Sequence, residues 1–182
     1  GDHLPVGGYG TFVEALAQGL DVRLGHEVVR VTHGLDGASV ETRDGARFDA
    51  SHVVVTVPLG VLRAETIVFD PPLTEAKREA LDRLRMGSLE KVVLVFDEKH
   101  WSFDREILVH LSERPGEHPA FFDLSDDAGA PTIAVLYAGT YARQAQAELS
   151  DRELVDRAIE ALSAALGRSL PEPSHTHVTR WT

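Results

Sequence analysis

The sequence predicts an α+β protein built on a mixed, largely antiparallel sheet flanked by helices. Short runs of β-forming residues follow one another with turn signals between them, without the regular alternation of strand and helix that a βαβ protein shows. Three segments with helical periodicity interrupt these runs. With 182 residues, 43% of them hydrophobic, the chain suits one medium domain or two lobes that share a core.

The first third of the chain is expected to form one helix and several short strands. Residues 11–20, TFVEALAQGL, place their large apolar side chains on one face of an amphipathic helix. Runs of β-forming residues follow at residues 21–24, 26–33, 38–44 and 46–57. The turn signals LDG at 35–37 and RDG at 43–45 predict hairpin connections. The last run is rich in valine and ends at Pro58, which cannot donate a hydrogen bond to a strand ladder.

The rest of the chain is expected to contain two helices and the remaining strands. Residues 74–85, TEAKREALDRLR, predict a helix, and the strand that contains Lys91 follows it. Further strands are expected at residues 106–111, 120–124, 132–138 and 176–181. The clearest helix spans residues 150–167, where Ser150 and Glu153 are spaced as a capping box and a glycine closes the C-terminal end.

Charge and composition exclude several classes of function. The formal net charge is -11 and the sequence has no cluster of lysine and arginine, so no nucleic-acid partner is expected. The chain has no cysteine, which excludes disulfides, thiolate metal sites and cysteine nucleophiles. No apolar run reaches membrane-spanning length, and we expect a soluble protein with a cytoplasmic location and no membrane partner.

Local motifs alone identify no catalytic site. The sequence contains neither a GxGxxG nor a GxxxxGK[ST] phosphate-binding pattern, and no GxSxG nucleophile elbow. The GGYG segment at 7–10 precedes a helix and could approach an anion, but its spacing favours a structural turn. The HTH segment at 175–177 puts two histidines on one face of a strand, but no third ligand lies nearby in the sequence. We therefore expect no metal site.

Lys91 comes directly before a run of apolar residues that predicts a strand, in the segment GSLEKVVLVF at 87–96. Because this strand is apolar at odd and even positions alike, it is expected to be covered on both faces. Lys91 is either a solvated strand end with an apolar stem, or a desolvated lysine that can handle protons. Trp181, near the end of the chain, is either a packing residue or part of a site. Periodicity does not decide between these alternatives.

Four blocks of sequence together resemble the flavin-containing amine oxidase family, which includes monoamine oxidases, polyamine oxidases and the lysine-specific histone demethylases. The blocks are GGYGTFVEALAQGLDVRLGHEVVRV at 7–31, VVVTVPLGVLRAETIVFDPPLTEAKREAL at 53–81, MGSLEKVVLVFDEKHW at 86–101 and VTRW at 178–181. Their order and spacing are those of the family, so the resemblance extends over nearly the whole chain. The segments PLGVL, FDPPL and KVVLVFD are most similar to those of the polyamine oxidase and demethylase branch.

The resemblance implies an activity and a cofactor. Members of the family oxidise the C–N bond of a primary or secondary amine, pass a hydride equivalent to FAD, and reoxidise the flavin with O2 to give H2O2. The imine product then hydrolyses. Lys91 matches the lysine that contacts the flavin N5 region through a water, where it handles protons or assists the O2 reaction. The expected partner is a small-molecule amine.

The resemblance also implies the residues that contact the cofactor. Val28 matches the residue whose backbone meets the adenine. Thr56, Val57 and Pro58 match the end of a strand that passes close to FAD. Trp181 matches an aromatic side chain beside the isoalloxazine ring.

The chain departs from the family pattern in two respects. It lacks the βαβ fingerprint that holds the FAD pyrophosphate, and it lacks the family's C-terminal segment. We therefore expect the inactive middle part of an enzyme, with residues 1–59 from the FAD-binding lobe, 60–182 forming the substrate-binding lobe up to its return strand, and FAD held only in a longer parent protein. The alternatives are a non-catalytic binding module on the same scaffold, or another flavoenzyme such as an amino-acid oxidase. The sequence does not indicate an oligomeric state.

Overall fold

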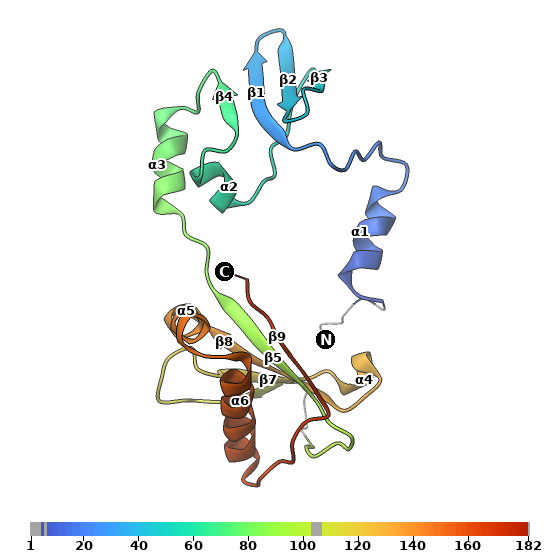
Figure 1. Ribbon diagram of the computed structural model, residues 1–182, viewed down its shortest axis with the longest axis vertical. Coiled ribbons are helices and arrows are strands. Elements are labelled where there is room, and N and C mark those ends of the chain that lie inside the picture. The colour runs from blue at the N-terminus through green and yellow to red at the C-terminus, as the bar shows by residue number, and fades with distance from the viewer. Residues whose placement is uncertain (1–4, 6, 103–106, 182) are drawn as a thin grey trace. The chain divides into compact units, whose positions relative to one another are not determined.

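The computed structural model describes residues 5, 7–102 and 107–181, and these residues form two compact units (Figure 1). The N-terminal unit consists of residues 7–86, and the C-terminal unit consists mainly of residues 87–182. The predicted α+β class is confirmed, because one sheet is mixed, the other is antiparallel, and both are accompanied by helices. No helix in the described ranges is both long and apolar enough to cross a membrane.

The N-terminal unit is built on a four-stranded sheet in the order β3-β2-β1-β4. Its elements are α1 (Tyr9–Ala17), β1 (Val28–Gly34), β2 (Gly37–Thr42), β3 (Arg47–Ala50), α2 (Leu59–Arg63), β4 (Val68–Asp70) and α3 (Glu75–Arg83). Strands β1, β2 and β3 pair antiparallel through the two predicted hairpins, and β4 joins β1 in parallel.

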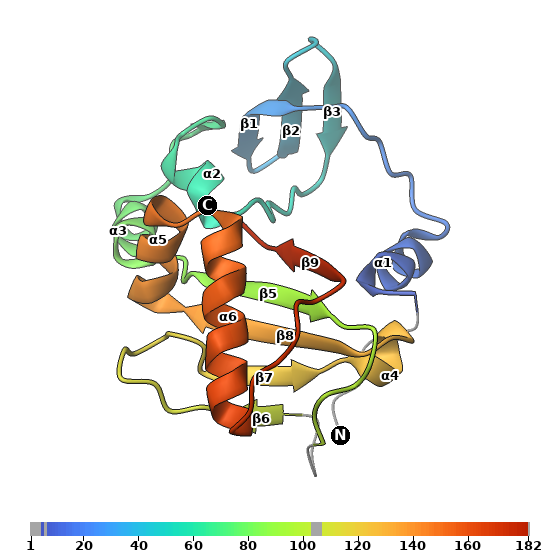
Figure 2. The same ribbon diagram turned by 60° about the horizontal axis from the view of Figure 1, so that its bottom comes forward.

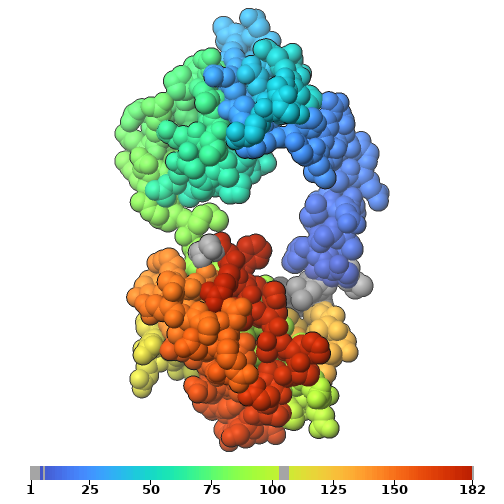
Figure 3. All heavy atoms as spheres, viewed as in Figure 1, coloured from blue at the N-terminus to red at the C-terminus, as the bar shows by residue number. Residues whose placement is uncertain are grey.

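The C-terminal unit is built on a five-stranded antiparallel sheet in the order β6-β7-β8-β5-β9. Its elements are β5 (Leu89–Val95), β6 (Ile107–Val109), β7 (Ala120–Asp123), α4 (Ser125–Ala128), β8 (Thr132–Ala138), α5 (Gly139–Glu148), α6 (Asp151–Leu166) and β9 (His175–Val178). Helix α6 crosses one face of this sheet (Figure 2). In the space-filling view, the orange and red atoms of α5, α6 and the last strand form most of the visible face of this unit (Figure 3).

The hydrophobic core lies between this sheet and its two long helices. Leu94 of β5, Phe121 of β7 and Val135 of β8 are fully buried against Leu154 and Leu162 of α6. Helix α6 begins with the predicted capping box and ends at a glycine in the left-handed conformation, as the sequence indicates. The C-terminal unit therefore has a complete core of its own on one side of its sheet.

Several predicted elements differ from those observed. No strand forms at residues 21–24, and the strand expected at 176–181 ends at Val178. The strand expected at 106–111 is observed at Ile107–Val109, while its first residue lies outside the described ranges. Four elements were not predicted, namely α2, β4, α4 and α5.

The apolar faces expected on the two helices of the N-terminal unit are not buried. The helix expected at 11–20 ends at Ala17, and its large side chains, such as Phe12 and Leu16, are exposed. The helix expected at 74–85 is also exposed except for the half-buried Leu81. Periodicity correctly predicted that these helices form, but it did not predict burial, because Leu81 is the one large apolar side chain of the two helices that is even half-buried among the described residues.

The boundary between the two compact units falls between residues 86 and 87 of the sequence. The boundary expected between the two lobes falls between residues 59 and 60. The units are defined by contacts within this chain, and the lobes are defined by which ligand each part holds in the family. The assignment of residues 1–59 and 60–182 to two lobes therefore stays a prediction.

Candidate functional site

Lys91 lies on the face of β5 that the helices leave open. Val92 and Leu94 are fully buried on the helix-covered face, whereas Lys91 is exposed and Val93 is half-buried. The expectation that β5 is covered on both faces is wrong for the described residues. The strand is apolar at both sets of alternating positions, but within the described residues of the C-terminal unit the helices cover only one of its faces.

The open face carries an apolar row that crosses the sheet around Lys91. The register places His177 of β9 beside Val93, Val93 beside Ala134, Ala134 beside Phe122, and Phe122 beside Ile107. One step along, Lys91 pairs with Leu136. We call the surface formed by these side chains, together with the exposed Leu89 and Val109, the open face. Strand alternation makes Lys91 the one lysine, arginine or carboxylate side chain on this face among the described strand residues.

Trp181 is held at the same end of β5 as Lys91, although 90 residues separate them in the sequence. The Trp181 backbone N–H donates to Oε1 of Glu90 at 3.0 Å. The Lys91 backbone N–H donates to Oγ1 of Thr179 at 2.9 Å, and the Thr179 N–H donates to the Lys91 carbonyl at 3.0 Å. Trp181 is 77% exposed. Two residues predicted from the family resemblance are therefore brought together by contacts that the sequence did not reveal.

Glu90 was missed in the sequence, although its position gives a signal. It belongs to the same alternating set as Val92 and Leu94, and its side chain is fully buried on the helix-covered face. A carboxylate at a core position of a strand requires hydrogen-bonding partners, and a polar residue in an apolar set is the pattern that indicates them. Opposite Glu90 lies Tyr137, whose pKa is raised to about 12, mainly by burial and in part by the Glu90 charge.

The other predicted cofactor residues lie in the N-terminal unit. Val28 is the half-buried first residue of β1 and pairs with Thr42. Pro58 is the N-terminal cap of α2, and its carbonyl accepts from the Val61 N–H at 3.0 Å. The strand expected just before it, at 53–57, does not form.

A strand requires a neighbour for its backbone groups, and no described segment pairs with residues 53–57. Within this segment Val57 is half-buried and Thr56 is exposed. Thr56, Val57 and Pro58 therefore lie at the surface of the N-terminal unit. They do not form the end of a strand, contrary to the expectation.

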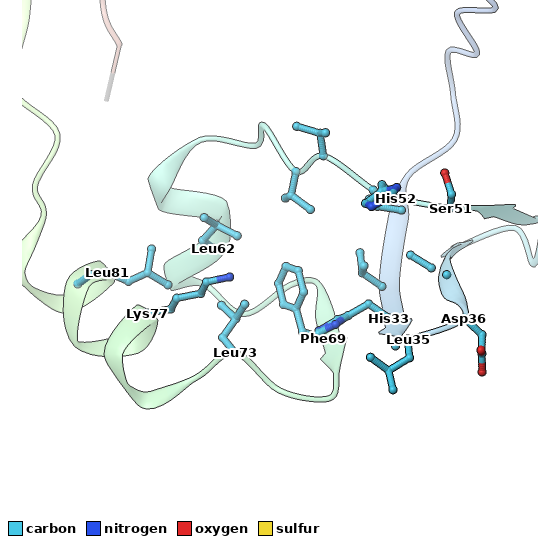
Figure 4. A pocket seen from close by; sticks show the side chains of 18 residues that line it. His33, Leu35, Asp36, Ser51, His52, Leu62, Phe69, Leu73, Lys77 and Leu81 are labelled. Carbon is cyan, nitrogen blue, oxygen red and sulfur yellow. The ribbon is translucent and has the colours of Figure 1, made fainter.

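A cavity of about 920 Å³ lies within the N-terminal unit, between its sheet and helices α2 and α3 (Figure 4). Leu62, Phe69, Leu73 and Leu81 point into it, and Lys77 reaches toward it from α3 (Figure 4). None of the six predicted site residues lines this cavity. Its walls are mostly apolar, and its polar lining side chains are His33, Asp36, Ser51, His52 and Lys77.

A second depression, of about 660 Å³, lies in the C-terminal unit and is bordered by charged side chains and by His118. His118 is 2% exposed, and its ring meets those of Tyr137 and Tyr141 edge to face. Burial lowers the pKa of His118 to about 4, so its imidazole is neutral at neutral pH. Neither here nor in any other part of the described ranges are three or more metal-ligating side chains arranged to hold a metal ion.

The fold is similar to that of oxidases of known structure. Putrescine oxidase bound to putrescine superposes with a TM-score of 0.80 at 26% sequence identity, over 97% of this chain and 39% of the other. The whole chain, residues 1–182, matches the family model of the flavin containing amine oxidoreductases, and it belongs to that family.

Relatives of known name include oxidases and demethylases. The chain is 35% identical over 181 residues to polyamine oxidase 4 of Oryza sativa subsp. japonica. The matched region covers all of this chain and 37% of the relative. It is 38% identical over 188 residues to lysine-specific histone demethylase 1 homolog 1 of the same plant, which covers 22% of that relative. The chain thus spans well under half the length of the relatives that it matches. The predicted resemblance to the amine oxidase family is confirmed.

Proposed function

We propose that this chain is the substrate-binding portion of an FAD-dependent amine oxidase, joined to part of the FAD-binding lobe, and that a longer parent protein holds the FAD. The observation that carries the proposal is the placement of Lys91 and Trp181 at one end of an open, apolar sheet face, linked through Thr179 and Glu90, in a chain of the amine oxidoreductase family. We assign residues 1–59 to the FAD-binding lobe and residues 60–182 to the substrate-binding lobe.

The proposed substrate is a small primary or secondary amine. Relatives are named polyamine oxidases, and a similar structure is of putrescine oxidase with putrescine bound. The apolar side chains of the open face suit the carbon chain of such an amine. The positive charge of Lys91 disfavours a protonated amine beside it, which favours the neutral amine whose nitrogen lone pair assists loss of a hydride.

The residues at this end of the sheet fit a flavin. An exposed indole offers a flat surface for an aromatic ring, and an exposed ammonium group lies on the neighbouring strand. When bound, FAD accepts the hydride equivalent from the amine and is reoxidised by O2, which gives H2O2. We assign Trp181 a place beside the isoalloxazine ring of the flavin. We assign Lys91 Nζ the role of holding a proton, through a water, near the flavin N5.

We assign the remaining cofactor contacts to the N-terminal unit. The backbone of Val28 would meet the adenine, and Thr56, Val57 and Pro58 would pass close to the cofactor. Support for these four positions comes from the family match alone. None of them supplies a group that reacts.

The isolated 182-residue chain is expected to bind FAD weakly or not at all and to be inactive. Support comes from the lack of a GxGxxG pattern in its sequence, because that pattern holds the pyrophosphate through a helix N-terminus. The purified chain should be colourless. A yellow preparation with one FAD per chain would overturn this part of the proposal.

The function is tested on the parent protein with a panel of primary and secondary amines and an assay for H2O2. Lys91→Met should slow reoxidation of the reduced flavin by O2 by roughly 10²-fold, the scale of one proton-transfer group. Lys77→Met, which removes an ammonium from α3, is the matched control and should leave the rate unchanged. If the Lys91 variant reoxidises at the wild-type rate, the role given to Lys91 is wrong.

Two other functions are separable from this one. A non-catalytic binding module would use the open face for a protein partner, and its reading frame would begin near Gly1 without an upstream GxGxxG after a strand. Another flavoenzyme, such as an amino-acid oxidase, would release H2O2 from amino acids but not from simple amines.

A further inference from the structure

A buried carboxylate occupies a core position one residue before Lys91. Glu90 is fully buried among apolar side chains on the helix-covered face. Burying a carboxylate without partners is costly, so such a group is retained only with good hydrogen bonds. Its partners therefore indicate what the residue does.

Both oxygens of the Glu90 carboxylate are bound by the same short segment. Thr179 Oγ1 donates to Oε2 at 2.6 Å, and the Trp181 backbone N–H donates to Oε1 at 3.0 Å. The Thr179 hydroxyl in turn accepts from the Lys91 N–H at 2.9 Å. Lys91, Thr179, Glu90 and Trp181 thus form one continuous chain of hydrogen bonds, which ties the candidate lysine to the candidate aromatic residue.

This chain of bonds replaces the strand ladder where β9 ends. The last backbone bond between the two strands runs from the Thr179 N–H to the Lys91 carbonyl. At the next step along β9, the Trp181 N–H meets a side-chain carboxylate and not a carbonyl of β5. The separation between Trp181 and β5 is therefore set by the length of the Glu90 side chain.

The other side of the segment is fixed to the junction of α5 and α6. Arg180 donates to the carbonyls of Gln146 and Leu149 at 2.9 and 3.0 Å, and to the Asp151 carboxylate at 2.8 Å. This anchor holds the backbone of the segment over the helices. It leaves Glu90 as the group that sets the distance on the side of β5.

We propose that Glu90 is a positioning residue, which holds the backbone of Trp181 at a fixed place relative to Lys91. The proposal rests on the proposed function, because that function makes the mutual placement of these two residues important. Glu90 itself acts only through the residues that it binds. A carboxamide of the same shape keeps one oxygen acceptor for the Trp181 N–H and offers an N–H to the Thr179 hydroxyl, so Glu90→Gln should preserve the placement, whereas Glu90→Ala should not.

The first test uses the 182-residue chain, whose two tryptophans report on different places. With 5-fluorotryptophan incorporated, the fluorine resonance of buried Trp101 reports on the core and that of Trp181 reports on the segment. Glu90→Ala should narrow the Trp181 resonance and move it toward its position in the unfolded chain, with the Trp101 resonance unchanged. Glu90→Gln and the exposed control Glu98→Ala should resemble the wild type. An unchanged Trp181 resonance in Glu90→Ala would overturn the proposal.

If Glu90→Ala does not fold, the Trp101 resonance will also move. The variant Thr179→Val is then used in the test instead of Glu90→Ala. This change removes one hydroxyl at constant shape and should loosen Trp181 alone. A wild-type Trp181 resonance in Thr179→Val, with Trp101 intact, would show that the hydrogen-bonded chain does not hold the segment and would overturn the proposal.

The second test uses the parent protein with its FAD. Glu90→Ala should slow reduction of the flavin at saturating amine by roughly 10²-fold, the scale of a misplacement of about 1 Å, and should shift the flavin absorption band. Glu90→Gln should restore both. Wild-type reduction in Glu90→Ala, despite a loosened Trp181, would overturn the proposal and leave the proposed function standing. If the wild-type parent oxidises no amine, the proposed function fails, and the fluorine spectra alone decide whether Glu90 holds Trp181.

Discussion

Two adjacent valines of β5, Val92 and Val93, allow a test of whether one face of this strand is open. Val92 is fully buried between the sheet and its helices, and Val93, the next residue, is half-buried on the open face. Val92→Ala and Val93→Ala remove the same atoms and lose the same β-propensity. Any difference between their effects on the free energy of unfolding therefore reports on burial.

The expected magnitudes follow from the burial of each side chain. Removing two buried carbon groups at Val92 costs about 0.8 kcal/mol each plus a cavity term, or roughly 2–3 kcal/mol. The half-buried Val93 lies between Ala134 and His177 but has no helix of its unit packed over it, so its truncation should cost roughly 1 kcal/mol or less. With a urea slope of about 1.5 kcal/mol/M, the two midpoints should differ by about 1 M.

The assay is urea unfolding of the 182-residue chain, followed by the fluorescence of buried Trp101, which lies in the same core. A Trp181→Phe background removes the exposed second tryptophan, so the signal reports on the C-terminal unit. Equal midpoint shifts for Val92→Ala and Val93→Ala would refute the open face, because they would mean that both sides of β5 are covered.

Three further predictions concern stability. Ser150→Ala removes the capping box of α6 and should lower the free energy of unfolding by about 1 kcal/mol, measured by thermal unfolding. His118 has a folded-state pKa of about 4, below its unfolded value, so the unfolded chain binds the proton more tightly. The stability that neutral His118 contributes is present above pH 6.5 and is lost as the pH falls toward 4, and His118→Asn should show a smaller loss over that range in urea titrations. Gly116→Ala should be several kcal/mol more destabilising than Gly129→Ala by the same measurement, because both have positive φ but only at Gly116 would a Cβ collide with a backbone carbonyl.

The sequence predicted α6 and β8 of the C-terminal unit well because their signals are local and agree with their packing, whereas α4 and α5 of the same unit were not predicted. The capping box and left-handed glycine of α6 are properties of single residues, and the helix forms where they indicate. Strand β8 coincides with the predicted residues 132–138. In both cases the apolar side chains find the partners that the pattern requires.

The N-terminal unit was predicted less well because its patterns depend on neighbours. Residues 53–57 have the composition of a buried strand, yet no described segment supplies the backbone partners that a strand requires. The apolar side chains of α1 likewise have the correct spacing without a covering surface. A pattern states what a segment can bury, and the rest of the protein determines whether burial occurs.

The candidate site could be predicted only in part. Lys91 and Trp181 were found through the family resemblance, and local pattern left both undecided. Their connection through Glu90 was not predicted, because it depends on hydrogen bonds across about 90 residues of sequence. The sequence did contain one sign of it, since Glu90 is the polar member of an otherwise apolar alternating set.

The most direct test of the central claim is an anaerobic absorbance titration of the FAD-loaded parent protein with an amine. A primary or secondary amine should bleach the long-wavelength flavin band, with one amine consumed per flavin. Admission of O2 should restore the band and release one H2O2. A flavin band that no primary or secondary amine bleaches would contradict the proposed function.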